Sequence, residues 1–140
     1  VHAGNLLIGR GNKTSMIYLI DFDAAVNWSV VDIYTSPINE ATARQTDLKC
    51  LGCLMVSFGG GGPSNNEIIL NAIDMTAFCK GAPEELRTYL EYLRDLPKDG
   101  MPDYAFLKGL FQAAITSKKY GDPAEGLDWV KDSNAPLSSV

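Results

Sequence analysis

The chain has 140 residues, a formal net charge of -5 and an isoelectric point near 4.7. Its length fits one domain with a buried core, and its acids outnumber its scattered bases by 17 to 12, which argues against a nucleic-acid surface. The sequence contains no apolar run long enough to cross a bilayer and no signal pattern, so we expect an intracellular protein, cytoplasmic or nuclear.

The first 25 residues predict a β-hairpin. Two short apolar segments rich in Ile, Leu and Tyr, at 6–8 and 16–22, flank the turn-forming sequence G-R-G-N-K-T-S. Residues 26–45 show no clear periodicity, and we expect irregular structure there.

A buried central helix is expected from Thr46 onward. The sequence T-D-L-K-C-L-G-C-L-M-V-S-F is apolar on nearly all sides of a helix, which is typical of a helix enclosed by others. Either Thr46 or Asp47 suits its N-terminal end. The glycines at 59–62 and Pro63 end it. This glycine run lacks the Lys-Ser/Thr and the preceding strand of a phosphate-binding loop, so we interpret it as a connection.

Further helices are predicted in the second half. Apolar residues at helical spacing predict a short helix within 65–75. Pro83 and the two acids after it open the next helix, which stops at Pro97 and has Leu86, Leu90 and Leu93 on one face.

Asp103 is expected to cap the following helix. Its buried stripe is predicted to consist of Phe106, Leu107, Leu110, Phe111 and Ala114. From Gly121 we expect a short helix that frays.

Three cysteines, at positions 50, 53 and 79, fit a reducing compartment better than a disulfide framework. Cys50 and Cys53 form a C-x-x-C pattern. With a single His in the chain and no second Cys pair, a zinc site or a redox pair is disfavoured. We expect two small buried side chains one helical turn apart.

These patterns predict a mainly α (α+β) fold, with one short β-hairpin followed by four or five helices around a buried central helix. The sequence has no internal repeat and no low-complexity linker. We expect one domain over residues 1–132, divided into 1–25, 26–45 and 46–132, and a tail at 133–140.

Seven short sequences follow one another in a particular order: Asn5-Leu-Leu-Ile-Gly-Arg-Gly, Tyr18-Leu-Ile-Asp-Phe, Tyr34-Thr-Ser-Pro-Ile-Asn, Asp47-Leu-Lys-Cys-Leu-Gly, Cys79-Lys-Gly-Ala-Pro-Glu-Glu-Leu, Tyr89-Leu-Glu-Tyr-Leu-Arg and Pro102-Asp-Tyr-Ala-Phe-Leu-Lys. Together they resemble the C-terminal lobe of a protein kinase of the casein kinase I and vaccinia-related kinase group. The resemblance covers residues 1 to about 130. It implies a kinase-like C-lobe, with the catalytic- and metal-loop hairpin at 1–25 and a shortened activation segment at 26–45.

The resemblance implies roles for individual residues. Asp21 matches the Asp that bridges Mg²⁺ to the nucleotide phosphates, and Asn5 matches the residue that holds the second metal ion. Both offer the hard oxygen atoms that Mg²⁺ prefers; the alternative is that they merely cap the hairpin ends. Asp47 matches a buried Asp that accepts N–H bonds from the catalytic loop, and its alternative is a plain N-cap.

Several positions depart from the kinase pattern. His2 stands where the family carries a Lys, so a fixed cation becomes a group that is mostly neutral at pH 7. Asp23 stands where the metal loop has Gly, which adds a carboxylate and a Cβ atom. Only eleven residues separate Phe22 from Tyr34, and residues 24–36 contain no base. We therefore expect the substrate groove to be lost.

Two functions remain open. The first is a degenerate, non-catalytic kinase-like C-lobe that acts as a binding or structural module, with no cofactor and with a protein partner or homo-oligomer covering its exposed face. The second is a fragment of an active Ser/Thr kinase that uses Mg-ATP. It requires a nucleotide-binding lobe and a catalytic Asp, which the motif H-R-D-L-x-x-x-N places one residue before Val1. We expect neither nucleic-acid nor membrane binding.

Overall fold

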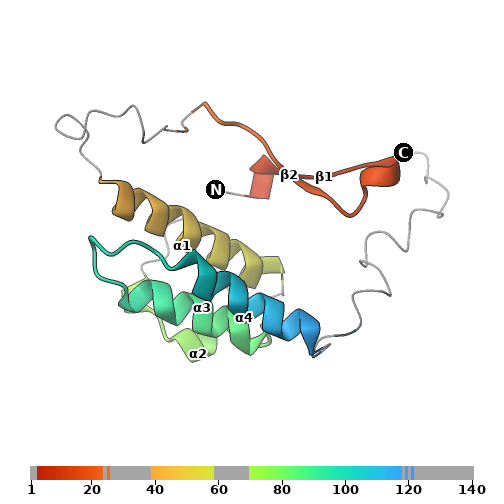
Figure 1. Ribbon diagram of the computed structural model, residues 1–140. Coiled ribbons are helices and arrows are strands. Elements are labelled where there is room, and N and C mark those ends of the chain that lie inside the picture. Colours follow the sequence, from red (N-terminus) through yellow and green to blue (C-terminus); the bar gives the residue numbers. More distant parts are fainter. Residues whose placement is uncertain are drawn as a thin grey trace.

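The computed structural model describes residues 3–23, 25, 39–58, 70–117, 119 and 121. In these residues the fold is mainly helical, with one two-stranded antiparallel sheet that precedes the helices in the chain (Figure 1). The predicted class, a mainly α protein with one β-hairpin, is therefore confirmed.

The hairpin follows a short 3-10 turn, η1 (Ala3–Asn5), and consists of β1 (Leu6–Ile8) and β2 (Ile17–Leu19). Its register pairs Leu6 with Leu19, Leu7 with Tyr18 and Ile8 with Ile17. The ladder continues at both ends, because the N–H of Gly9 donates to the C=O of Met16 and the N–H of Ile20 donates to the C=O of Asn5, each at 2.9 Å. The second strand is thus shorter than the expected 16–22.

The turn of the hairpin contains a second 3-10 helix, η2 (Gly11–Lys13). Gly11 has φ of 60°, a left-handed conformation that glycine adopts without steric cost. The glycine-rich sequence therefore explains why the chain reverses at this point.

The first long helix, α1 (Glu40–Phe58), begins six residues earlier than predicted. Asn39 caps it, because its side-chain Oδ1 accepts the N–H of Thr42 at 2.7 Å. The expectation of irregular structure up to residue 45 is wrong for 40–45, where Glu, Ala, Arg and Gln favour a helix. Residues 26–38, the rest of the expected activation segment, lie outside the described residues.

The prediction that this helix is buried all round is also wrong. Its fully buried residues are Ala41, Gln45, Gly52 and Val56, which lie on one side of the helix. The other described side chains of α1 are partly or fully exposed. One face of α1, rather than its whole circumference, therefore contributes to the core.

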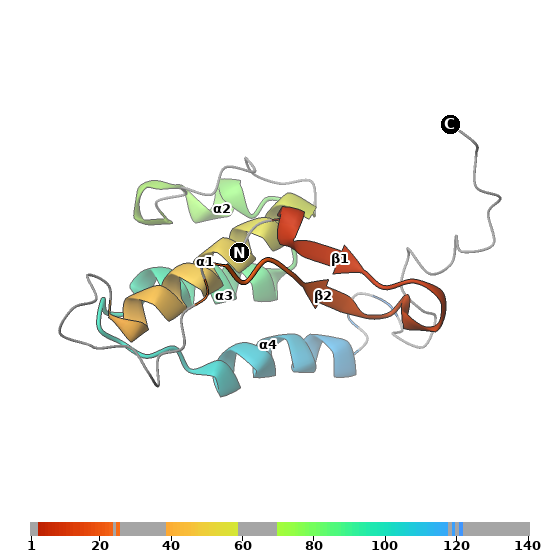
Figure 2. The same ribbon diagram turned by 90° about the horizontal axis from the view of Figure 1, so that it is seen from above.

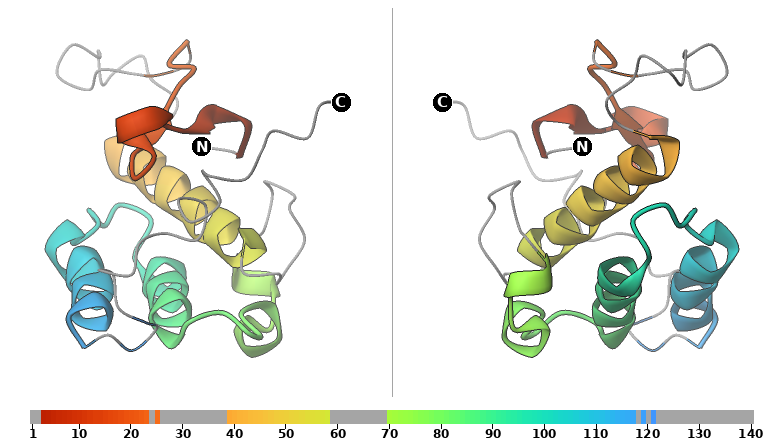
Figure 3. Two further views of the ribbon diagram at one scale, coloured as in Figure 1. Left: turned by 90° about the vertical axis from the view of Figure 1, so that its right-hand side faces the viewer. Right: turned by 90° about the vertical axis from the view of Figure 1, so that its left-hand side faces the viewer.

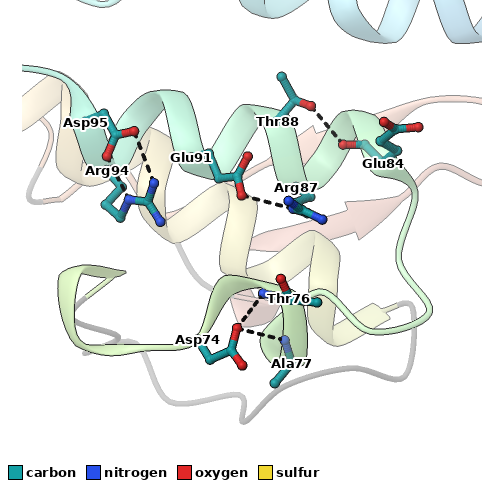
Figure 4. A network of polar contacts seen from close by, with 9 residues as sticks. All are labelled: Asp74, Thr76, Ala77, Glu84, Arg87, Thr88, Glu91, Arg94 and Asp95. Atoms are coloured by element: carbon teal, nitrogen blue, oxygen red, sulfur yellow. Dashed lines mark hydrogen bonds and ion pairs between the residues drawn. The ribbon is translucent and has the colours of Figure 1, made fainter.

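The segment after the glycine run forms two short helical pieces, η3 (Leu70–Ala72) and α2 (Met75–Phe78). The expected continuous helix at 65–75 is interrupted at Ile73 and Asp74, and residues 65–69 lie outside the described part of the chain. Asp74 caps α2 by accepting the N–H groups of Thr76 and Ala77 at 2.9 and 3.4 Å (Figure 4).

The two later helices confirm the predictions from sequence. Helix α3 (Glu84–Asp95) follows Pro83, and α4 (Tyr104–Thr116) is capped by Asp103, whose carboxylate accepts the N–H of Phe106 at 2.9 Å. The chain beyond Gly121, including the expected fraying helix and tail, lies outside the described residues.

The predicted stripe of α4 is only partly buried. Leu107 and Ala114 are buried, whereas Phe106 is 41% exposed. Phe106 instead packs its ring against Tyr92, with centroids 5.0 Å apart. The edge of the core therefore lies at this aromatic pair.

Helix α3 occupies the centre of the helical part. It contacts α1, α2, η3 and α4, and Leu90 and Leu93 on α3, like Val56 on α1, are completely buried. Figure 3 shows α2, α3 and α4 in a row, with α1 lying across them. In Figure 3 the hairpin lies on the side of α1 away from this row, and in Figure 2 its tip extends beyond the end of α1. The layers are thus hairpin, α1 and the row of three helices.

Polar contacts attach the start of α1 to the connection between α3 and α4. The buried Gln45 donates its side-chain N–H groups to the C=O groups of Pro97 and Gly100, at 2.7 and 2.8 Å. Asn39 donates to the carboxylate of Asp99 at 2.8 Å. These bonds link residues more than fifty positions apart and fix the loop between the two helices.

Candidate functional site

The open end of the hairpin brings together two of the residues singled out in the sequence. The hydrogen bond from Ile20 N–H to Asn5 C=O sets Asn5 directly beside the backbone that leads into Asp21. The Asp21 side chain is exposed and the Asn5 side chain is partly buried. A carboxylate and an amide oxygen, both of which are ligand types for Mg²⁺, therefore lie at the same end of the sheet.

Asp21 has an unusual backbone. Its φ is 64°, and among the described residues no other non-glycine residue has a positive φ. This left-handed conformation costs an ordinary L-residue about 1–2 kcal/mol, and Asp tolerates it better than most. Such conformations concentrate at functional sites, so Asp21 is a candidate functional residue.

Asp23 adds a second exposed carboxylate near this end. The turn that carries it is closed by the N–H of Ala25, which donates to the C=O of Phe22 at 2.9 Å. However, the described residues contain no cluster of three or more His, Cys, Asp or Glu side chains that could hold a metal ion. Any cation at this end would accordingly keep most of its water, as Mg²⁺ commonly does.

Asp47 does not have the predicted environment. It lies inside α1, not at its N-terminus, and its side chain is exposed rather than buried. The reason is the early start of α1 at Glu40. Asp47 follows the buried Gln45 by two positions, which places it roughly 200° round the helix. The N-cap interpretation and the expected burial of Asp47 are therefore wrong, whereas its role as an acceptor of N–H bonds from the catalytic loop stays a prediction. His2 lies outside the described residues.

The hairpin also presents an apolar surface. Directly opposite residues share a face of the sheet, so Leu6, Ile8, Ile17 and Leu19 form one aliphatic face, which we call the hairpin face. Ile17 is 58% exposed and Ile8 is 52% exposed. In the sequence, this surface is indicated by the uninterrupted apolar run M-I-Y-L-I. A strand with one buried and one solvated face would instead alternate apolar and polar residues.

The charges of the hairpin are separated along its length. Arg10 and Lys13 are exposed at the tip, whereas Asp21 and Asp23 are exposed at the open end. The aliphatic residues lie between these two groups. The hairpin is therefore positive at one end and negative at the other.

The cysteines have the character of core residues rather than of a reactive site. All three are free; Cys79 is buried, and Cys50 and Cys53 are partly buried instead of fully buried as expected. Burial raises the pKa of Cys53 to about 11, with smaller contributions from Cys50 and Cys79. Burial likewise raises the pKa of Cys79. A protonated thiol is a poor nucleophile and a poor metal ligand.

The charged groups of α3 form ordinary surface pairs. Arg87 bonds Glu91 at 2.9 Å and Arg94 bonds Asp95 at 2.7 Å (Figure 4). The bond from Arg94 holds the pKa of the Asp95 carboxyl below its usual value. Pairs this exposed stabilise a helix only slightly, and their geometry is that of helix neighbours rather than of a catalytic group.

No protein-family model matches this chain. Among the helices of the described residues, none combines the length and the apolar character needed to cross a membrane. The fold and the site thus define a mainly helical protein with an apolar, charge-separated hairpin that carries two oxygen donors at its open end.

Proposed function

We propose that this protein is a degenerate, kinase-like C-terminal lobe of the casein kinase I and vaccinia-related kinase group, and that it acts as a non-catalytic binding module in a protein complex. The order of its elements, a hairpin followed by helices, supports the resemblance. So does the position of Asn5 and Asp21 at one end of the hairpin. The partner binds at the hairpin.

The observation that carries this proposal is the exposure of the hairpin face. Burial of apolar area contributes roughly 25 cal/mol per Å², so aliphatic side chains in water favour association. Contiguous exposed apolar surface marks interaction sites on soluble proteins. Three of the four residues of the hairpin face are more than 40% exposed, at 52%, 58% and 43% for Ile8, Ile17 and Leu19.

The charges of the hairpin support a non-catalytic role. Phosphoryl transfer depends on metal ions and cationic side chains positioned around the phosphates. On this hairpin the cations Arg10 and Lys13 lie at the tip, away from Asp21 at the open end. Asp23 adds negative charge near Asp21 instead. The described residues of the hairpin therefore supply no cation where a nucleotide phosphate would lie.

Site-specific photocrosslinking tests the binding function. A photoreactive amino acid is placed at Ile17 on the hairpin face, and a matched probe is placed at Ile115, which is 52% exposed on α4. In the cells that make this protein, we expect a discrete crosslinked protein from position 17 and none from position 115. Equal crosslinking from both positions, or none from either, would contradict the proposal.

A second candidate, part of an active Ser/Thr kinase that uses Mg-ATP, is favoured by one observation. Asn5 and the strained Asp21 lie at the same end of the hairpin, where the kinase pattern has its two metal ligands. Phosphotransfer to protein Ser or Thr with Mg²⁺ or Mn²⁺ separates the two functions. We expect no transfer; reproducible transfer that is lost in Asp21→Asn and retained in Asp99→Asn would establish the kinase instead.

A further inference from the structure

The outer edge of β2 has free backbone groups. In an antiparallel pair, successive residues of a strand alternately bond the neighbour and face away from it. Met16 and Ile20 bond β1, through Gly9 and Asn5, so the N–H and C=O groups of Ile17 and Leu19 face away from β1. We call these groups the β2 edge. Within the part of the chain that the structure describes, no backbone hydrogen bond covers this edge.

The β2 edge lacks the features that normally protect a strand from pairing with another chain. Natural edge strands are blocked by charged side chains, by proline or by bulges. Residues 16–20, M-I-Y-L-I, contain no charge and no proline, and the register is regular. Ile17 and Leu19 are also exposed. The edge is therefore open to a further strand.

The charge separation indicates which strand binds there. If two identical hairpins pair antiparallel, the tip of each lies beside the open end of the other. Arg10 and Lys13 of one copy then approach Asp21 and Asp23 of the second. A two-fold interface uses the same patch on both copies and must be self-complementary, and opposite charges at the two ends of the hairpin meet this requirement.

We propose that a second copy of this chain adds to the β2 edge, so that the two hairpins form one four-stranded antiparallel sheet about a two-fold axis. This inference rests on the proposed function and names its partner. The axis passes between the Tyr18 residues of the two copies. Ile17 of each copy then lies opposite Leu19 of the other, which gives two hydrogen-bonded residue pairs. Lys13 of each copy lies near Asp23 of the other.

Two further features support this arrangement. A two-stranded hairpin is marginally stable on its own, whereas sheets of three or more strands are stable. If two copies paired along β1 instead, with the two-fold axis at Leu7, Arg10 of one copy would lie opposite Gly4 of the other. No acidic residue would then lie near the tip of either hairpin. Charge complementarity therefore selects the β2 edge over the β1 edge.

The solution mass of the 140-residue chain, followed over a wide range of concentration, tests the proposal. We expect the mass to rise from 15.2 kDa toward twice that value. Ile17→Lys, which puts a charge on the β2 edge, should leave a monomer. Leu7→Lys is its matched control, because Leu7 is 49% exposed and apolar like Ile17 but belongs to β1 and lies outside the hairpin face. That variant should still dimerise.

Charge reversal keeps the test valid even if Ile17→Lys disrupts the hairpin. Lys13→Glu and Asp23→Lys should each weaken the dimer roughly fivefold, because each removes two symmetry-related pairs of opposite charge. The double variant, Lys13→Glu with Asp23→Lys, should recover most of the lost dimer affinity, since it restores both pairs with the two charges exchanged.

Three results would overturn the inference: a monomer at every concentration, growth beyond a dimer, or equal effects of Leu7→Lys and Ile17→Lys. The crosslinking experiment separates this failure from a failure of the proposed function. A monomeric chain whose position 17 crosslinks to a different protein contradicts self-association and leaves the binding module in place. A monomeric chain with no crosslink contradicts both.

Discussion

Gly52 of α1 packs directly onto Leu90 of α3. A Cβ atom at position 52 would lie 2.5 Å from Cδ2 of Leu90 and 2.8 Å from Cε1 of Tyr89. Leu90 is completely buried, and a side chain enclosed by a close-packed core has little room to move aside. The absence of a side chain at Gly52 is thus what allows the two helices to approach.

Gly52→Ala should therefore destabilise the protein although alanine favours helices. We expect a loss of about 1–3 kcal/mol from overpacking, measured by chemical denaturation. Gly109→Ala is the matched control in α4, since a Cβ there meets nothing within 4 Å; it should gain up to about 1 kcal/mol. A stabilising Gly52→Ala would show that the two helices can separate at little cost.

Gln45→Leu should destabilise the protein through the connection between α3 and α4. The change leaves the C=O of Gly100 without the Gln45 donor and removes one of the two donors of the Pro97 C=O, which keeps the N–H of Gly100, at a cost of about 1–3 kcal/mol. Hydrogen exchange should also accelerate in residues 97–100. Gln112→Leu, at an exposed position of α4, should change stability by less than about 0.5 kcal/mol. Equal effects of the two substitutions would contradict a specific role for Gln45.

Asp103→Ala should destabilise α4 by about 1 kcal/mol, because the N–H of Phe106 loses its acceptor. Asp103→Asn keeps a side-chain oxygen at the same place and should stay close to the parent protein. Thermal or chemical unfolding measures both. If Asn proved as costly as Ala, the contribution would come from the charge rather than from the cap.

Cys53 should alkylate slowly. With a pKa of about 11, it carries roughly a hundredth of the thiolate of a free thiol near pH 8, and labelling with iodoacetamide followed by mass spectrometry should show this lag. The raised pKa also fixes the sign of the stability effect. The unfolded thiol loses its proton first, so the stability contribution is complete below about pH 9 and declines toward pH 11. Labelling as fast as in denaturant would refute the burial of this group.

Asp21→Val should loosen the open end of the hairpin. A β-branched residue at φ of 64° costs about 1–2 kcal/mol more than Asp, so the Ile20 N–H that bonds Asn5 should exchange faster with solvent. Asp21→Asn tolerates the same conformation and should leave the exchange rate nearly unchanged. Similar rates in Val and Asn variants would mean that residue 21 adopts an ordinary φ in solution.

Local signals determined much of this structure. The hairpin was predictable because apolar strands flank a glycine-rich turn, and α3 and α4 were predictable because Pro83 and Asp103 mark helix starts and the leucines that follow have helical spacing. Each of these signals acts within a few residues of the chain. The same holds for Asn5 and Asp21, whose position at one end follows once the hairpin register is known.

Contacts between distant segments decided the rest. The sequence placed the start of α1 at Thr46, but Asn39 and Gln45 extend ordered structure back to Glu40 by bonding the α3–α4 connection, more than fifty residues away. That earlier start moved Asp47 from a helix end to an exposed side. Likewise, only the tertiary structure decided that α3 rather than α1 occupies the centre, because an apolar helix shows in sequence which residues avoid water but not which neighbour they meet.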